Sequence, residues 1–367
     1  MKHPFGTDRV QTWLLAIIAT GFMLIVLEQG RSFLLPLAIA ILIFSLLTAA
    51  ADSITRVRIL GVSAPYWLSN IIVISVSALF ILIIAGILAG QIDAFAAAAP
   101  HYAARVQEIV IDLFSWLGDD ISAGLVDSVA EIDFGFHARW VAGSAGYGLT
   151  TVILIVIYIG FLMAERSHAS RKFDRLFTSP RRAEVVRGVV QSIGSSIRRY
   201  ILVKTIVSSL TGLLTYAALK SIGVDFAETW GLLAFLLNFI PNIGSIIASV
   251  LPTLASMVQF EIWTPVLVVF LGLGTLQFVI GNIVEPMLMG RTLNLSSFAI
   301  ILSLTFWGAV WGIVGMFLAV PITVMLMIIC AHVTPLRPLA VLLSADGEPP
   351  DNLPESSHLS PDHHEAG

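Results

Sequence analysis

The sequence has little charge for its length. Of its 367 residues, 12% are charged and 57% are hydrophobic, whereas soluble globular domains are about 25% charged. The net charge at pH 7 is −4, and the chain has too few charged side chains to cover the surface of a soluble protein of this size. We therefore exclude the secreted, fibrous and nucleic-acid-binding classes of protein.

The sequence has a single cysteine and none of the common enzyme motifs. The single cysteine, Cys330, lies within an apolar run and can form neither a disulfide framework nor a thiolate metal site. The sequence lacks HExxH, GxSxG, P-loop and GxGxxG motifs, which mark metallopeptidases, serine hydrolases and nucleotide-binding proteins. The sequence therefore predicts a protein that is not an enzyme and has no cofactor and no metal.

Long uncharged runs are what the sequence has instead. Residues 67–90 and 262–284 carry no charged side chain and are long enough to cross about 30 Å of hydrocarbon. We predict an all-α polytopic membrane protein with about eight transmembrane helices, some of them broken or re-entrant in the C-terminal half. The predicted spans are residues 12–29, 33–50, 67–90, 145–164, 201–222, 229–257, 263–284 and 297–331.

Basic residues near the spans predict the orientation in the membrane, because Lys and Arg are retained on the cytoplasmic side. Residues 165–204 contain ten basic and three acidic residues, whereas residues 91–144 contain two basic and eight acidic residues. The first segment is therefore predicted to be cytoplasmic and the second extracytoplasmic. The same pattern places the N-terminus and the C-terminus in the cytoplasm.

Composition and periodicity divide the chain into six segments. The last segment contains six of the sixteen prolines and is predicted to be disordered, because it cannot bury enough apolar area to fold. The segments are an N-terminal three-span region (1–90), an extracytoplasmic insertion of amphipathic helices (91–144), a fourth span (145–164), a basic cytoplasmic segment with an interfacial helix starting at Ser179-Pro180 (165–204), a C-terminal core (201–333) and a disordered cytoplasmic tail (334–367).

Helix-breaking residues interrupt the predicted span 229–257. Pro241 and Pro252 each remove a backbone donor and clash with the preceding turn, so we expect the helix to break or kink there. Helices broken at membrane depth expose backbone dipoles that can hold polar substrates or ions. The polar and small residues at and beyond the first break are Asn238, Asn242, Gly244, Ser245 and Ser249. The serines either line a pathway or bond to their own helix backbone.

The predicted span 263–284 carries a second group of polar residues. Gln277, Gly281 and Glu285 recur at every fourth position, so Gln277 and Glu285 lie along a groove opened by Gly281, with Asn282 beside it. Glu285 is either a proton-exchanging carboxylate or an interfacial residue paired with Arg291. Lys204, at the start of the fifth span, is predicted to reach the cytoplasmic surface.

The final apolar stretch, residues 297–331, is too long for one ordinary span. Gly308, Gly312 and Gly315 cluster near its middle, and Gly308 and Gly312 form a GxxxG pattern that permits close helix packing. The sequence leaves two structures open for this stretch: one long tilted helix or a re-entrant hairpin.

Four motifs occur in order in the C-terminal half. They are Asn238 to Gly244 (NFIPNIG), Glu285-Pro286 with Met289-Gly290-Arg291, Phe306-Trp307-Gly308, and Gly312 to Pro321 (GIVGMFLAVP). These motifs resemble the core of the autoinducer-2 exporter family, the PerM-like permeases. The plan of three spans, an outer insertion, a fourth span, a basic inner segment and a Pro/Gly-rich C-terminal half also matches. The resemblance covers about residues 10–335.

The resemblance implies a bacterial inner-membrane protein that moves a small molecule or ion and assembles as a homo-oligomer among membrane lipids. Some relatives are assigned to export of the quorum-sensing furanone autoinducer-2, and others to exchange of sodium or lithium for protons. Carried over residue by residue, the implied pathway consists of Pro241, Asn242, Gly244, Glu285, Pro286 and Pro321.

We therefore expect a secondary transporter or facilitator that exports a small polar molecule, with autoinducer-2 as a candidate. One alternative is a Na⁺(Li⁺)/H⁺ antiporter that uses Glu285. The other is a non-transporting membrane scaffold that acts through its outer insertion and acidic tail.

Overall fold

The computed structural model describes residues 7–56, 58–59, 62–63, 150–166, 179–290 and 294–348, with scattered residues between 68 and 111 and between 168 and 177. The described chain is helical apart from two short strands, β1 (Arg58–Ile59) and β2 (Val62–Ser63), which pair in an antiparallel hairpin. Most of the predicted third span, residues 112–144 of the insertion and the tail beyond residue 348 lie outside the described residues. Four of the described helices are long and apolar enough to cross a membrane.

The chain divides into two compact units. The first comprises Met1–Ser45, Ile159–Tyr200 and Arg291–Gly367, and the second comprises Leu46–Tyr158 and Ile201–Gly290. Helices α1 (Thr7–Gln29) and α2 (Arg31–Arg56), and the helical residues 150–166, coincide with three of the predicted spans.

Helix α6 (Pro180–Ile222) joins two predicted elements. It begins at Pro180 and continues for 43 residues, which corresponds to about 65 Å at about 1.5 Å per residue. The predicted interfacial helix and the predicted span 201–222 are therefore one continuous helix. Because its length is about twice the thickness of the hydrocarbon layer, α6 must extend beyond the membrane core.

The predicted span 229–257 is wrong as a single crossing. It forms a helical hairpin of α7 (Ala227–Leu237) and α8 (Ile243–Gln259). The Gln259 side chain accepts a hydrogen bond from the Asp225 N–H and donates one to the Gly223 carbonyl, so the end of α8 returns to the start of α7. With 11 and 17 residues, both helices are shorter than the roughly 20 residues of a full span. Pro252 lies inside α8 and does not interrupt it.

The hairpin packs against α6 through two glycines. A Cβ on Gly212 would lie 2.7 Å from the Gly231 carbonyl oxygen, and a Cβ on Gly231 would lie 2.7 Å from the Tyr216 Cβ. The two backbones therefore approach as closely as only glycine permits.

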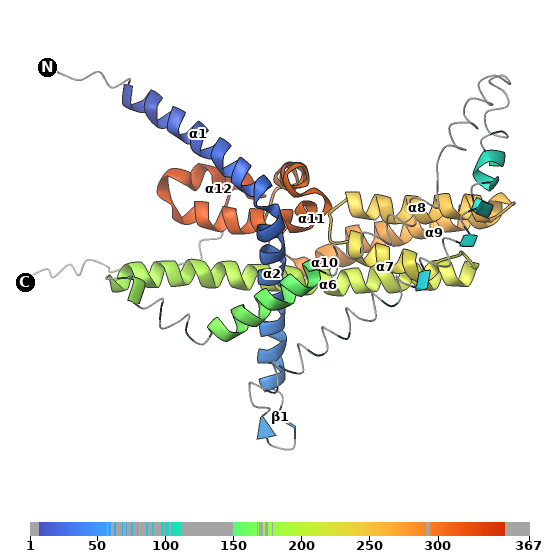
Figure 1. Cartoon of the computed structure of the whole chain (residues 1–367), viewed down its shortest axis with the longest axis horizontal. Helices are drawn as coiled ribbons and strands as arrows, with labels where there is room; N and C mark the ends of the chain where they lie inside the picture. Colours follow the sequence, from blue (N-terminus) through green and yellow to red (C-terminus); the bar gives the residue numbers. More distant parts are fainter. Residues whose placement is uncertain are drawn as a thin grey trace, which may run out of the picture. The chain divides into compact units, whose positions relative to one another are not determined.

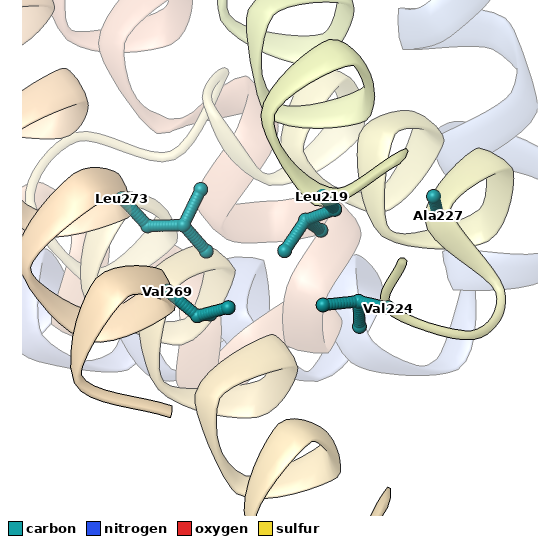
Figure 2. Packing of buried hydrophobic residues seen from close by; sticks show 5 residues of the cluster. All are labelled: Leu219, Val224, Ala227, Val269 and Leu273. Atoms are coloured by element: carbon teal, nitrogen blue, oxygen red, sulfur yellow. The ribbon is translucent and has the colours of Figure 1, made fainter. Parts of the chain in front are cut away.

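A continuous helical run follows the hairpin. Helix α9 (Trp263–Val279) lies beside α8 (Figure 1) and passes through the π-helix η2 (Ile280–Val284) into α10 (Glu285–Met289). Val269 and Leu273 from α9 point toward Leu219, Val224 and Ala227 (Figure 2). These five residues form a buried apolar cluster.

The stretch from 297 to 331 is a hairpin, which resolves the alternative left open by the sequence. In α11 (Ser297–His332), Gly312 has φ 64° and ψ −147°, where the helix reverses. Ser303 donates a hydrogen bond to the Ala319 carbonyl in the returning limb at 3.1 Å. After α11, the Leu295–Ser344 bridge holds the two ends of this region together.

The structure differs from the predicted disordered tail at its beginning. Residues Thr334–Leu336 form a 3₁₀ helix, η3, and Arg337–Leu343 form α12. Both segments carry proline at a helix start, where its missing N–H costs no hydrogen bond, and α12 packs on α11 with Ala340 fully buried. The prolines that indicated disorder here therefore mark helix starts.

Candidate functional site

A cavity of about 470 Å³ lies in the second unit, at the tip of the α7–α8 hairpin, and eight of its fourteen lining residues are polar or charged. Four elements contribute to it: α6, the turn between α7 and α8, α8 itself, and the run from α9 to α10. The lining residues are Lys204, Asn238, Pro241, Asn242, Ser245, Ile246, Ser249, Val250, Gly274, Gln277, Phe278, Gly281, Asn282 and Glu285.

The cavity brings together the two polar stretches that the sequence singled out separately. From the first stretch come Asn238, Pro241, Asn242, Ser245 and Ser249, and from the second come Gln277, Asn282 and Glu285. They face a common space because α8 returns alongside α9.

Three candidate pathway residues do not line this cavity. A Cβ on Gly244 would collide with the Leu237 carbonyl oxygen, so Gly244 permits the tight turn between α7 and α8. Pro286 lies in the first turn of α10. Pro321 is buried inside α11, in the other unit.

The three glycines proposed for helix packing have different environments in α11. A Cβ on Gly308 would lie 2.7 Å from the Met316 Cε, and a Cβ on Gly315 would collide with the Trp307 carbonyl oxygen, so both positions sit between the limbs of the hairpin. A Cβ on Gly312 would have no described neighbour within 4 Å. Gly312 therefore makes the reversal itself, and the expected GxxxG packing face does not include it.

The turn at the hairpin tip is strained at Asn242. This residue has φ 61° and ψ −58°, and the Ile243 N–H donates to the Pro241 carbonyl at 2.7 Å. Together these define a classic γ-turn, a rare and strained conformation. Among the described residues, the Asn242 side chain caps no N–H of α8. Backbone strain of this kind is concentrated at ligand-binding and switch regions.

Lys204 was missed as a site residue. Its ammonium Nζ lies 2.5 Å from the Glu285 Oε1, and the side chains of Lys204 and Glu285 are 2% and 21% exposed. The expectation that Lys204 reaches the cytoplasmic surface is therefore wrong. The sequence contained one signal that Lys204 faces the protein interior: Ser208 follows it by one helical turn, and the two residues form one polar helix face. Arg291, the partner expected for Glu285, lies outside the described residues.

Several side chains around the cavity donate hydrogen bonds to the protein. The Asn238 Nδ2 donates to the Ser208 Oγ at 3.0 Å, and the Asn282 Nδ2 donates to the Phe278 carbonyl at 3.0 Å. The Ser249 hydroxyl donates to the Ser245 carbonyl of its own helix. Oxygen atoms remain as acceptors, and the buried Gln277 Oε1 has no hydrogen-bond partner among the described residues. The amide groups and the Lys204 ammonium keep further N–H donors, so the cavity offers both donors and acceptors to a polar ligand.

A second contact joins the described part of the predicted outer insertion to the base of the hairpin. The Tyr102 hydroxyl donates to the Asp225 Oδ2 at 2.9 Å, and the Tyr102 ring packs against Phe226 with centroids 6.2 Å apart. Burial, together with the hydrogen bond to Asp225, raises the pKa of the Tyr102 phenol above its ordinary value of 10.0. The hydroxyl therefore stays protonated at physiological pH.

Comparison with known proteins gives a consistent assignment. Residues 14–334 match the family described as AI-2E family transporter. The chain is 30% identical to the AI-2 transport protein TqsA of Escherichia coli (strain K12), over 89% of this chain and 95% of that protein. It is 29% identical to YhhT of the same strain, over 89% and 98% of the two chains. It is 24% identical to PerM, over 85% and 90%. The family resemblance of the C-terminal motifs is confirmed: this chain belongs to the AI-2E transporter family.

Proposed function

We propose that this protein is a secondary transporter or facilitator that exports a small polar molecule across the bacterial inner membrane. The observation that carries the proposal is the cavity of about 470 Å³, whose lining combines amide, hydroxyl, ammonium and carboxylate groups with apolar side chains, within otherwise apolar helices. Polar groups are costly inside a membrane and usually mark a substrate or ion pathway. The AI-2 transport protein TqsA is a relative over nearly the whole chain, so autoinducer-2 is the first substrate to test.

The hairpin supplies the part that would move. Its base is held by the Gln259 side chain, whereas its tip carries the strained Asn242 turn beside the cavity. A strained turn is poised to adopt a second conformation when a ligand stabilises that conformation. In this mechanism Asn242 and Gln277 bind the substrate, and movement of the tip exposes the cavity alternately to the two sides of the membrane.

Flux of labelled autoinducer-2 into everted membrane vesicles tests the proposal. Vesicles with the wild-type protein are expected to accumulate the label, and an imposed proton gradient shows whether transport is coupled to protons. Gln277→Leu removes a polar amide from the cavity lining and should raise the KM about 10-fold, because one lost hydrogen bond to the ligand costs about 1.5 kcal/mol.

Ser221→Ala is the matched control for substitution of a polar residue. The Ser221 hydroxyl bonds to its own helix on an exposed face, outside the cavity lining, so this variant should transport at the wild-type rate. If correctly inserted wild-type protein gives no flux above empty vesicles, autoinducer-2 is not the substrate. If Gln277→Leu transports normally, the cavity is not the pathway.

A further inference from the structure

We propose that Lys204 is a built-in counter-cation that determines the charge selectivity of the cavity. Its ammonium occupies the place that a metal cation would take beside Glu285, so the cavity accepts an uncharged polar molecule and excludes Na⁺ and Li⁺. The inference rests on the proposed function in one respect only, that the transported molecule binds in this cavity.

The position of the ammonium is the first step. Lys204 is among the largest fully buried side chains of the described chain, and its Nζ contacts the Glu285 Oε1 at 2.5 Å. An ammonium in this environment is stable when a carboxylate compensates its charge. Lys204 and Glu285 are the charged residues in the described lining of the cavity, so the lining carries no net charge.

The oxygen atoms near Glu285 are the second step. The Gln277 Oε1 is buried and has no partner among the described residues. Gln277 and Asn282 line the same cavity as the carboxylate, and the one described bond of the Asn282 side chain uses its nitrogen. Carboxylate and amide oxygens are the ligands that hard cations prefer. Without the Lys204 ammonium, this part of the cavity would have the composition of a cation site.

The consequence for selectivity follows from charge. A metal cation at Glu285 would share one carboxylate with an ammonium at close range, in surroundings where like charges repel strongly. An uncharged molecule with hydroxyl groups meets no such repulsion. The arrangement therefore favours export of an uncharged polar molecule over cation exchange at Glu285.

Thermal unfolding of the purified full-length protein in detergent tests the inference. Each variant is compared in sodium chloride and in N-methylglucamine chloride at equal ionic strength. The wild type should unfold at the same temperature in both salts. Lys204→Met should unfold at least about 3 °C higher in sodium, with a shift that grows with the logarithm of the sodium concentration, because bound Na⁺ stabilises only the folded state. Lys204→Met/Glu285→Gln should lose this shift.

Lys172→Met is the matched control. Lys172 also forms an ion pair at 2.5 Å, with Glu165, but both side chains are exposed. The same loss of one positive charge there should produce no sodium-dependent shift. A shift in Lys172→Met equal to that of Lys204→Met would mean that sodium acts on the surface charge, and this would overturn the inference.

Two other results would also overturn it. One is a folded Lys204→Met variant with no sodium-dependent shift. The other is binding of ²²Na⁺ to the wild type that is lost in Glu285→Gln, and this measurement decides the matter even if the Lys204 variants do not fold. If the wild type gives no autoinducer-2 flux above empty vesicles, the proposed substrate is contradicted but the exclusion of cations is not. Failure of the proposed function and failure of the selectivity inference are therefore distinguishable.

Discussion

At the scale of single residues, Asn242 has a strained backbone conformation and also lines the cavity. A side chain with a Cβ is strained at its φ of 61°, and asparagine tolerates positive φ better than alanine does. Because the Asn242 side chain caps no described N–H of α8, its amide is available to a ligand.

Two substitutions at this position separate the structural contribution from the ligand contact. Asn242→Ala should lower the free energy of unfolding by about 1 kcal/mol, because alanine is less stable at positive φ. Asn242→Gly should keep wild-type stability, because glycine adopts this conformation freely. Both variants should raise the transport KM about 10-fold if the amide binds substrate. Thermal unfolding in detergent and vesicle flux measure the two effects, and a normal KM in Asn242→Gly would exclude the amide as a ligand contact.

Residue-level reasoning singled out polar side chains that interrupt an apolar run, and their role in a pathway stays a prediction. Asn238, Asn242, Gln277 and Glu285 stood out for this reason, and all four line the cavity. Lys204 could not be recognised in the same way, because a lysine near the end of a span usually reaches the membrane surface. Its burial depends on a carboxylate 81 residues away, and a single sequence does not reveal that pairing.

At the scale of elements, proline and glycine located the breaks but not the reversals. The break near Pro241 was predicted, yet a kinked crossing and a hairpin have the same local signature. What decides between them is packing, such as the close approach of Gly212 and Gly231. This contact depends on two segments that only the folded chain brings together.

Gly312 provides a direct test of the second hairpin. Its φ of 64° and ψ of −147° are accessible almost only to glycine, so Gly312→Ala should destabilise the protein by about 1–3 kcal/mol. Gly272→Ala is the matched control: neither glycine has a described neighbour within 4 Å of an added Cβ, but Gly272 lies inside α9. Alanine is favoured there, so the control should be neutral or slightly more stable. Equal melting temperatures for the two variants would contradict the reversal at Gly312.

At the scale of the whole molecule, the described part of the predicted insertion contacts the base of the α7–α8 hairpin through Tyr102. Tyr102→Phe keeps the ring beside Phe226 but removes the hydrogen bond to Asp225, at a cost of about 1 kcal/mol. Hydrogen exchange at residues 101–109 should then rise about 5-fold.

Because the pKa of Tyr102 is raised in the folded protein, the stabilisation by its hydrogen bond is present below about pH 10 and is lost as the pH rises above it. The difference between the two proteins should therefore be constant from pH 6 to pH 9, and a difference that varied in this range would show that another group controls the contact.

The orientation of the two hairpins in the membrane gives the last prediction. If residues 165–204 are cytoplasmic, as their basic residues predict, α6 leads outward and the base of the α7–α8 hairpin is extracytoplasmic. The run from α9 to α10 then returns inward. Since the Leu295–Ser344 bridge joins the segment before α11 to the segment after α12, the residues after the bridge should also be cytoplasmic. A single long helix in place of the α11 hairpin would put them outside.

Cysteine labelling decides between these two topologies. In a Cys330→Ala background, Glu261→Cys and Ala345→Cys place single thiols at exposed positions in the α8–α9 loop and after α12. A membrane-impermeant maleimide should label position 261 in spheroplasts and position 345 only in everted vesicles. Position 261 controls for vesicle orientation, because its accessibility must reverse between the two preparations. Labelling of position 345 in intact spheroplasts would mean that α11 crosses the membrane, and the cytoplasmic C-terminus would then be wrong as well.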